Sequence, residues 1–381
     1  MNRSFYIIIA VLVVLGSGCK KMPTAVENSA SVSVQIFDQS GSMKVLFGDS
    51  LVRSADVTIR SINYGKEYHE VSDSSGRVLF NGLVSDQYSV VATRTLSETE
   101  MKAINGTSVQ RKLFGASSSI FVRADLHDGS AAIAVDLAAL SDIVFSEIYA
   151  CGPQGSGLYF HDKYMEVCNI SGSIKYLDGL VVARVSKGYI LDPMIYTSEV
   201  WKFPGSGTDY AIQPGQFVLV AEDAIDHRIN APGSIDESIA DFEYYRISQP
   251  DVDNPNVPNM IEIYQTSGVD WLIGGEKDAL VLCRVPNIDS LRYKDNFLTI
   301  PKEYVIDGVE YHTDPTRLDQ KYLDPKIDAG LAGGILFYTG YSMERKLRTT
   351  VSGWTLEDNN NSSIDFTKIQ HPTPRKHYAL P

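Results

Sequence analysis

Two glutamates, Glu147 and Glu166, each lie in the middle of a short apolar run rich in β-branched and aromatic residues. The runs are Ile143–Ala150 and Tyr164–Cys168, and a loop of Gly, Pro, Ser and Gln separates them. Such runs are typical of consecutive antiparallel strands. A charge on a buried sheet face costs several kcal/mol, and two facing carboxylates raise the pKa of one of them. The pair could therefore serve acid–base chemistry.

Three interpretations of Glu147 and Glu166 remain open from the residues alone. We favour one in which both lie on the solvent face or pair with Lys or Arg residues such as Lys163 or Arg184. The second is a shared calcium ion, and the third is catalysis by paired carboxylates.

A second group of oxygen-rich residues suggests calcium by composition alone. It comprises Asp251, Asp253, Asn254 and Asn256. An EF-hand loop requires a ligand where Pro255 stands and a glycine at its sixth position, and this stretch has neither. Residues 357–361 are similarly acidic and polar. We expect both stretches to be solvated turns, with calcium as the alternative and no other cofactor.

The spacings that mark common enzyme families are absent. The sequence contains no HExxH, GxSxG, P-loop or GxGxxG motif. Its seven histidines are scattered, whereas a zinc site needs closely spaced ligands. We therefore expect no enzymatic activity.

Aromatic side chains exposed on loops could instead bind a glycan or a peptide. The adjacent tyrosines Tyr244 and Tyr245 lie in a long polar stretch, residues 223–259, and we predict that they form an exposed pair. Loops of such length are usually functional.

The elements that would carry these residues are almost all strands. Alternating apolar patterns recur from residue 31 onward, tyrosines outnumber phenylalanines, and helical periodicity is scarce. The sequence predicts an all-β protein with two immunoglobulin-like β-sandwiches in tandem, over residues 31–140 and 141–381. The second is enlarged by the insertion 223–259 and a C-terminal extension.

The first thirty residues predict export and lipid anchoring. Arg3 precedes the apolar run Ile7–Leu15, which is too short to span a bilayer. Gly16–Gly18 then leads to Cys19, as at a lipoprotein cleavage site, although Leu15 stands four residues before the cysteine instead of three. We expect residues 1–18 to be a signal peptide and Cys19 to be lipidated. Residues 19–30 would then be a tether.

Charge limits the partners. The chain has 47 acidic and 34 basic residues and a formal net charge of −13. Such a chain is repelled by nucleic acid and by anionic headgroups, so membrane attachment would depend on acyl chains. The predicted location is the cell envelope, most naturally the outer membrane, on its periplasmic face or at the cell surface.

Three cysteines remain after Cys19: Cys151, Cys168 and Cys283. An odd number leaves at least one thiol unpaired. A Cys151–Cys168 disulfide would require a register that fits the two runs poorly, so we favour buried free thiols.

Several segments resemble known families. SEIY, DKYMEVCN and YLDGL in the stretch 141–180, IQPGQFVLVAEDAIDH at 212–227, and SMERK, GWTLEDNNNSS and PTPR near the end resemble a lamin-tail-type immunoglobulin-like domain. Positions Asp73, Gly76, Phe80, Leu83, Asp86, Tyr88 and Val90 resemble a carboxypeptidase-regulatory-like domain. The whole chain is similar to an uncharacterised family of Bacteroidota lipoproteins. The resemblance implies a stalk domain followed by a larger module, and it implies no enzymatic activity.

The sequence thus predicts a lipid-anchored envelope protein that binds a surface glycan, a protein or an outer-membrane transporter. The alternatives are a structural or adhesive surface protein without a small-molecule ligand, and a carboxylate-based hydrolase or hydrolase accessory.

Overall fold

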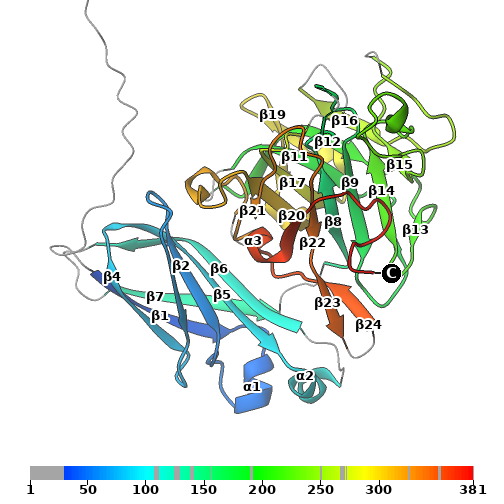
Figure 1. Ribbon diagram of the computed structural model, residues 1–381. Helices are drawn as coiled ribbons and strands as arrows, with labels where there is room; N and C mark the ends of the chain where they lie inside the picture. Colours follow the sequence, from blue (N-terminus) through cyan, green and yellow to red (C-terminus); the bar gives the residue numbers. More distant parts are fainter. Residues whose placement is uncertain are drawn as a thin grey trace, which may run out of the picture.

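The computed structural model describes residues 30–106, 111–123, 129–137, 141–155, 157–188, 192–248, 251–266, 271, 273–324, 327–350 and 353–380. Strands are the dominant regular structure among these residues and helices are few (Figure 1), so the predicted all-β sandwich class is confirmed. Within the described residues, no helix is both long and apolar enough to cross a membrane. The lipidation prediction at Cys19 lies outside the described residues.

Residues 30–137 form one seven-stranded arrangement in the order β3-β2-β5-β6-β7-β1-β4. Strand β1 alternates buried and half-buried side chains over all nine of its residues, which is the pattern of a strand with one face in the core. Their bounds are Ala30–Asp38 (β1), Asp56–Ser61 (β2), Glu67–Val71 (β3), Arg77–Leu83 (β4), Asp86–Leu96 (β5), Arg111–Val122 (β6) and Gly129–Leu137 (β7).

Two short helices accompany these strands, α1 (Ser42–Phe47) and α2 (Glu98–Asn105). Helix α2 begins where Ser97 and Glu100 form a reciprocal capping box, which satisfies two backbone N–H groups that the first turn leaves free.

The later part of the chain contains an eight-stranded sheet. Its order is β18-β19-β12-β11-β17-β20-β21, with β16 paired to β12. The bounds are Val181–Lys187 (β11), Met194–Lys202 (β12), Ile261–Gln265 (β16), Lys277–Cys283 (β17), Arg292–Lys294 (β18), Phe297–Pro301 (β19), Val305–His312 (β20) and Ala332–Gly333 (β21).

A six-stranded sheet packs against it, in the order β15-β14-β9-β8-β22-β25. One apolar core contains side chains of both sheets, such as Phe145 and Val167 from one and Leu280 and Tyr311 from the other, so the two sheets form a sandwich. The bounds are Ile143–Tyr149 (β8), Tyr164–Asn169 (β9), Phe217–Ala221 (β14), Phe242–Glu243 (β15), Ser342–Arg345 (β22) and Phe366–Ile369 (β25).

Small elements complete this part of the chain. Two two-stranded sheets pair Lys175–Tyr176 (β10) with Ala211–Ile212 (β13) and Leu347–Thr350 (β23) with Gly353–Leu356 (β24). Helix α3 spans Ser362–Asp365, and single 3-10 turns span His227–Ile229, Ile288–Ser290, Lys302–Tyr304 and Leu318–Gln320.

The strands predicted to carry the two glutamates are confirmed as β8 and β9. The strands of 30–137 (blue to cyan in Figure 1) and those of 143–369 (green to red) belong to different sheets. The domain boundary at residue 140 remains a prediction.

Candidate functional site

Three buried glutamates form a row across neighbouring strands of the six-stranded sheet. Glu166 of β9 pairs in register with Glu147 of β8, and Glu147 pairs with Glu344 of β22. All three side chains are fully buried. Since opposed residues on adjacent strands lie about 5 Å apart, their carboxyl groups gather on the face of the sheet that points away from the sandwich core. We call this face the outer face and the three residues the glutamate row.

A β-bulge helps to build the row. The register between β8 and β9 shifts between Phe145 and Glu147, so Ser146 is an extra residue on β8. Phe145 lies in the sandwich core, whereas the Ser146 hydroxyl donates to a carboxylate oxygen of Glu166 at 2.8 Å. The bulge therefore places a hydrogen-bond donor and Glu147 on the same side of the sheet.

The last residues of the chain cover the row. We call residues 371–380 the C-terminal strap; none of them belongs to a strand or helix. The backbone N–H of Thr373 lies 3.2 Å from both carboxylate oxygens of Glu147, and its hydroxyl donates to Glu344 at 2.8 Å. The hydroxyl of Ser342 also donates to Glu147.

The strap continues over the two outer members of the row. The backbone N–H of Arg375 donates to Glu166 at 2.5 Å, and that of Tyr378 donates to Glu344 at 3.1 Å. Leu380 then packs against an apolar cluster on the outer face that includes Cys168. Backbone amides of the strap thus replace the water that would otherwise solvate these carboxylates.

Burial dominates the electrostatics of the row. It raises the pKa values of Glu147 and Glu166, which the negative charges of neighbouring glutamates raise further, and it raises the pKa of Glu344 to about 7. In the described part of the chain, neither lysine nor arginine forms an ion pair with any of the three, and His377 is the only basic side chain near them, 3.4 Å from Glu344. These pKa values mean that the row retains protons near neutral pH.

His377 does not neutralise the row. Its Nε2–H donates to the carbonyl of Arg345 at 2.9 Å, and its Nδ1 accepts from the backbone N–H of Ala379 at 3.0 Å. That pattern requires the neutral imidazole, and burial lowers the pKa of His377.

The favoured interpretation of Glu147 and Glu166 is therefore wrong. Neither is on a solvent face, and neither pairs with Lys163 or Arg184. Arg184 forms ion pairs with Glu199 and Asp278 of the eight-stranded sheet. The residues that cover Glu147 and Glu166 come from the end of the chain, about two hundred positions away. Strand periodicity alone could not reveal them.

The residues predicted to bind calcium do not form a recognisable metal centre in the described part of the chain. Among the described residues, no three His, Cys, Asp or Glu side chains form a group suited to a metal ion. Asp251 accepts the backbone N–H of Arg246 at 2.6 Å, and Asp253 accepts the side-chain amide of Asn259 at 3.0 Å. These bonds order the turns of the insertion. Calcium binding at Glu147, Glu166, Asp251 or Asp253 stays an untested prediction.

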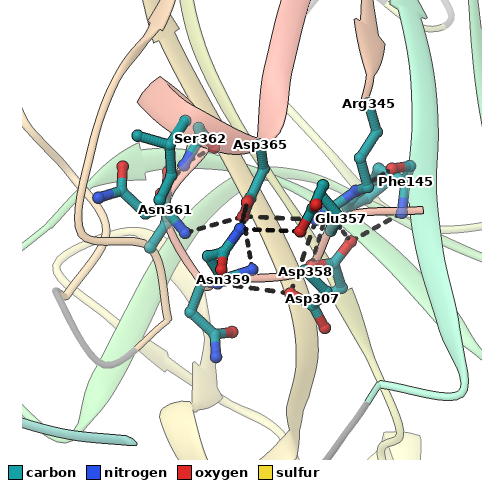
Figure 2. A network of polar contacts seen from close by, with 12 residues as sticks. Phe145, Asp307, Arg345, Glu357, Asp358, Asn359, Asn361, Ser362 and Asp365 are labelled. Atoms are coloured by element: carbon teal, nitrogen blue, oxygen red, sulfur yellow. Dashed lines mark hydrogen bonds and ion pairs between the residues drawn. The ribbon is translucent and has the colours of Figure 1, made fainter. Parts of the chain in front are cut away.

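The acidic stretch 357–361 surrounds a cation that belongs to the chain (Figure 2). Arg345 of β22 is fully buried and forms a bidentate pair with Asp307 of β20, at 2.8 and 3.0 Å. Its Nη1 lies 3.6 Å from Asp358 and 3.7 Å from Asp365. The guanidinium joins the two sheets of the sandwich and supplies the positive charge among these carboxylates.

The prediction of an exposed tyrosine pair is wrong for Tyr244. This ring is fully buried, stacked on Trp271 with centroids 4.5 Å apart and edge-on to Trp201 at 5.2 Å. Tyr245 is half-buried. Tyr244 follows β15 directly, so it continues the inward face of the six-stranded sheet into the sandwich core.

A second buried acidic group lies beneath the insertion. Asp162, Glu222 and Glu237 are all fully buried, and each has at least one carboxylate oxygen without a hydrogen-bond partner. Both oxygens of Glu237 lack one. Burial, together with the charges of Asp162 and Glu222, raises the pKa of Glu237 well above its ordinary value. No local sequence pattern predicts this group, because its members come from two separate connections, Asp162 from the one between β8 and β9 and the two glutamates from the one between β14 and β15.

The histidine beside Glu237 is also neutral. His227 donates its Nε2–H to the carbonyl of Asp223 at 2.9 Å and accepts from the hydroxyl of Tyr159 at 2.6 Å. Burial lowers the pKa of His227 to about 4. Glu237 therefore has no charged partner there, and a neutral Glu237 is the stable form.

The insertion exposes its aliphatic side chains. Ile229 and Ile247 are 82% and 86% exposed, and Leu158, on the loop that contacts the insertion through Tyr159 and His227, is 76% exposed. Ile239 and Val252 are also exposed. Five exposed aliphatic side chains therefore lie on the insertion and its neighbouring loop.

The free-thiol prediction is confirmed. Cys151, Cys168 and Cys283 are all buried and unpaired. Cys168 lies opposite Val144 in the β8–β9 register, which keeps it away from Cys151.

Comparison with known proteins agrees with this fold. Residues 213–373 match a family model described as "Protein of unknown function (DUF4876)". The matched residues begin before β14 and end inside the C-terminal strap, so they include the insertion, Arg345 and Glu344. The chain is also similar to a crystal structure of a DUF4876 family protein from Bacteroides thetaiotaomicron VPI-5482. The identity is 26% over 92% of this chain and 98% of that one, with a TM-score of 0.57.

Two other solved structures are much less similar to the chain. An adhesin candidate from Bacteroides ovatus ATCC 8483 has a TM-score of 0.22 at 10% identity, over 78% of this chain and 87% of that one. The fimbrial anchor protein Mfa2 from Porphyromonas gingivalis has a TM-score of 0.19 at 8% identity, over 67% and 78%. No curated protein matches the chain. The resemblances to lamin-tail and carboxypeptidase-regulatory-like domains stay predictions.

Proposed function

We propose that this chain is a lipid-anchored, non-enzymatic protein of the cell envelope, and that its insertion binds another protein. The observation that carries the proposal is the exposure of Ile229, Ile247 and Leu158 on the insertion and its neighbouring loop. Protein interfaces bury apolar residues of this kind at their centres.

The interior of the insertion supports a preformed surface. Asn254 donates to the carbonyl of Ala224 at 2.7 Å, and the backbone N–H groups of Asn254 and Ala224 donate to the two oxygens of Glu243 at 2.7 and 2.9 Å. Polar groups thus hold the turns from inside, while Ile229 and Ile247 remain exposed. A preformed surface loses little conformational entropy on binding.

A glycan partner is less well supported than a protein. Glycan sites rely on exposed aromatic rings, and Tyr244 is buried against Trp271 and Trp201. A carboxylate-based hydrolase is also less well supported, because the strap covers Glu147 and Glu166 and occupies the position that a substrate would need.

Site-specific photo-cross-linking in the native organism tests the binding role. A photoreactive amino acid at position 247 should give a discrete protein adduct, and the further change Ile229→Asp should reduce it about tenfold. Ile174→Asp is the matched control, since Ile174 is an exposed isoleucine outside the insertion; it should leave the adduct unchanged. If Ile229→Asp and Ile174→Asp reduced the yield of the adduct equally, or if no protein adduct formed at position 247, a role for this surface would be refuted.

The anchor is tested separately, because it can fail without affecting the surface. Cys19→Ser should abolish acyl labelling and move the protein from the membrane fraction to the soluble fraction. A Cys19→Ser protein that keeps its membrane association would refute lipid anchoring and leave the cross-linking result standing.

A further inference from the structure

The C-terminal strap can leave the sheet without breaking any strand. Its residues follow β25 and hold the outer face without strand pairing. The contacts are three backbone amides, those of Thr373, Arg375 and Tyr378, the packing of Leu380, and side-chain bonds of Thr373, Arg375 and His377. A segment that belongs to no strand or helix opens more readily than the paired strands beneath it. The strap is therefore a separable cover over the glutamate row.

The groups that face the row are almost all neutral or negative. Strands β9, β8 and β22 contribute Glu166, Glu147 and Glu344, and β9 also contributes the neutral phenol of Tyr164. The strap contributes neutral His377. The side chain of its Arg375 points away, to Asp241 at 3.2 Å and to the carbonyl of Ile239.

We propose that the C-terminal strap is a latch controlled by the proton content of the glutamate row. It stays closed while the row retains a proton and lifts when all three carboxylates are ionised, which uncovers the outer face of β9, β8 and β22. This proposal is independent of the function proposed for the insertion.

The direction of the response follows from the burial of the row. Under the closed strap, burial raises the pKa values of Glu147, Glu166 and Glu344. Under an open strap, water solvates them and their pKa values return toward 4.5, the usual value of a glutamate. The closed form therefore binds protons more tightly, and a rise in pH through neutrality favours opening.

Hydrogen–deuterium exchange of the full mature chain tests the latch. Protection of the amides of Thr373, Arg375 and Tyr378, corrected for intrinsic exchange, should fall about tenfold or more between pH 6 and pH 9. Amides of β17 should keep their protection as the internal reference. The change Glu166→Gln removes one charge from the row, so we expect it to move the midpoint of opening upward by about one pH unit.

A matched control separates the row from general effects of buried acids. Glu237→Gln also neutralises a buried glutamate, but outside the row, and it should leave the midpoint of the strap unchanged. Constant protection across the pH range would overturn the proposal, as would equal shifts with Glu166→Gln and Glu237→Gln. Loss of protection on EDTA treatment, restored by calcium at constant pH, would also overturn it in favour of a cation held by the row.

Discussion

Replacing Arg345 by Met should destabilise the second half of the protein more than any other single removal of a charge. The guanidinium makes four hydrogen bonds: two to Asp307, one to the carbonyl of Phe145 at 2.7 Å and one to the carbonyl of Glu357 at 3.0 Å. All of these groups lie where the two sheets meet (Figure 2). Met retains much of the volume and removes the charge and the donors.

The magnitude follows from what the substitution leaves behind. Asp307 is fully buried, and Arg345 is the cation that forms an ion pair with it in the described part of the chain. Breaking one side of a buried ion pair typically costs about 3–5 kcal/mol, against a total stability of about 5–15 kcal/mol for a typical domain. Arg228→Met is the control, because Arg228 is half exposed and its pairs with Asp226 and Asp236 are at the surface; such pairs contribute about 0–1 kcal/mol.

Urea unfolding followed by tryptophan fluorescence measures this loss, since Trp201, Trp271 and Trp354 all lie beyond residue 141. Burial raises the pKa of Asp307, and it raises that of Asp365 to about 6 despite the opposing guanidinium. Removing Arg345 raises both further, so the destabilisation should be larger at pH 8 than at pH 5, where the aspartates are protonated. A loss below about 1 kcal/mol at pH 8, or one independent of pH, would refute the reasoning.

Two further predictions concern the core and the acids beneath the insertion. Tyr244→Ala should lower the free energy of unfolding by about 3–5 kcal/mol and Tyr245→Ala by less than about 1 kcal/mol; similar losses in urea unfolding would contradict the stacked position of Tyr244. Glu237→Gln should match the wild type at pH 5. Above pH 5 it should become more stable than the wild type by up to about 1.4 kcal/mol for each pH unit, until the pH reaches the raised pKa of Glu237. Over that range the unfolded wild type releases a proton that its folded form retains. A variant that is less stable at pH 9 would show that the carboxylate has a partner.

The strands that carry the first two members of the glutamate row were predictable, whereas the burial of those residues was not. The β-branched and aromatic residues around Glu147 and Glu166 predict β8 and β9 to within one residue, because local sequence determines strand formation. Which side of a strand is covered depends on distant segments. Here the bulge at Ser146 and the strap residues near Thr373 decide it.

Tyr244 shows a similar limit. Its neighbourhood is polar and lacks regular periodicity, which favours an exposed loop, but the two-residue strand β15 pairs with β14 and carries the ring into the core. A strand of two residues leaves no pattern in the sequence. By contrast, the exposure of Ile229 and Ile247 cannot be predicted from composition, because isoleucine in a polar stretch is usually turned inward.

The buried acids of the second half differ in what neutralises them, and this difference indicates their roles. The aspartates around Arg345 are held by a permanent cation, so they stabilise the junction of the two sheets at every physiological pH. The glutamate row and Glu237 have no such cation and depend on protons. The protonation of these glutamates depends on the pH of the solvent, whereas the charge of the Arg345 guanidinium does not. The row is also covered by the C-terminal strap, which belongs to no strand or helix, so we expect a change in pH to alter the shape of the protein there without unfolding it.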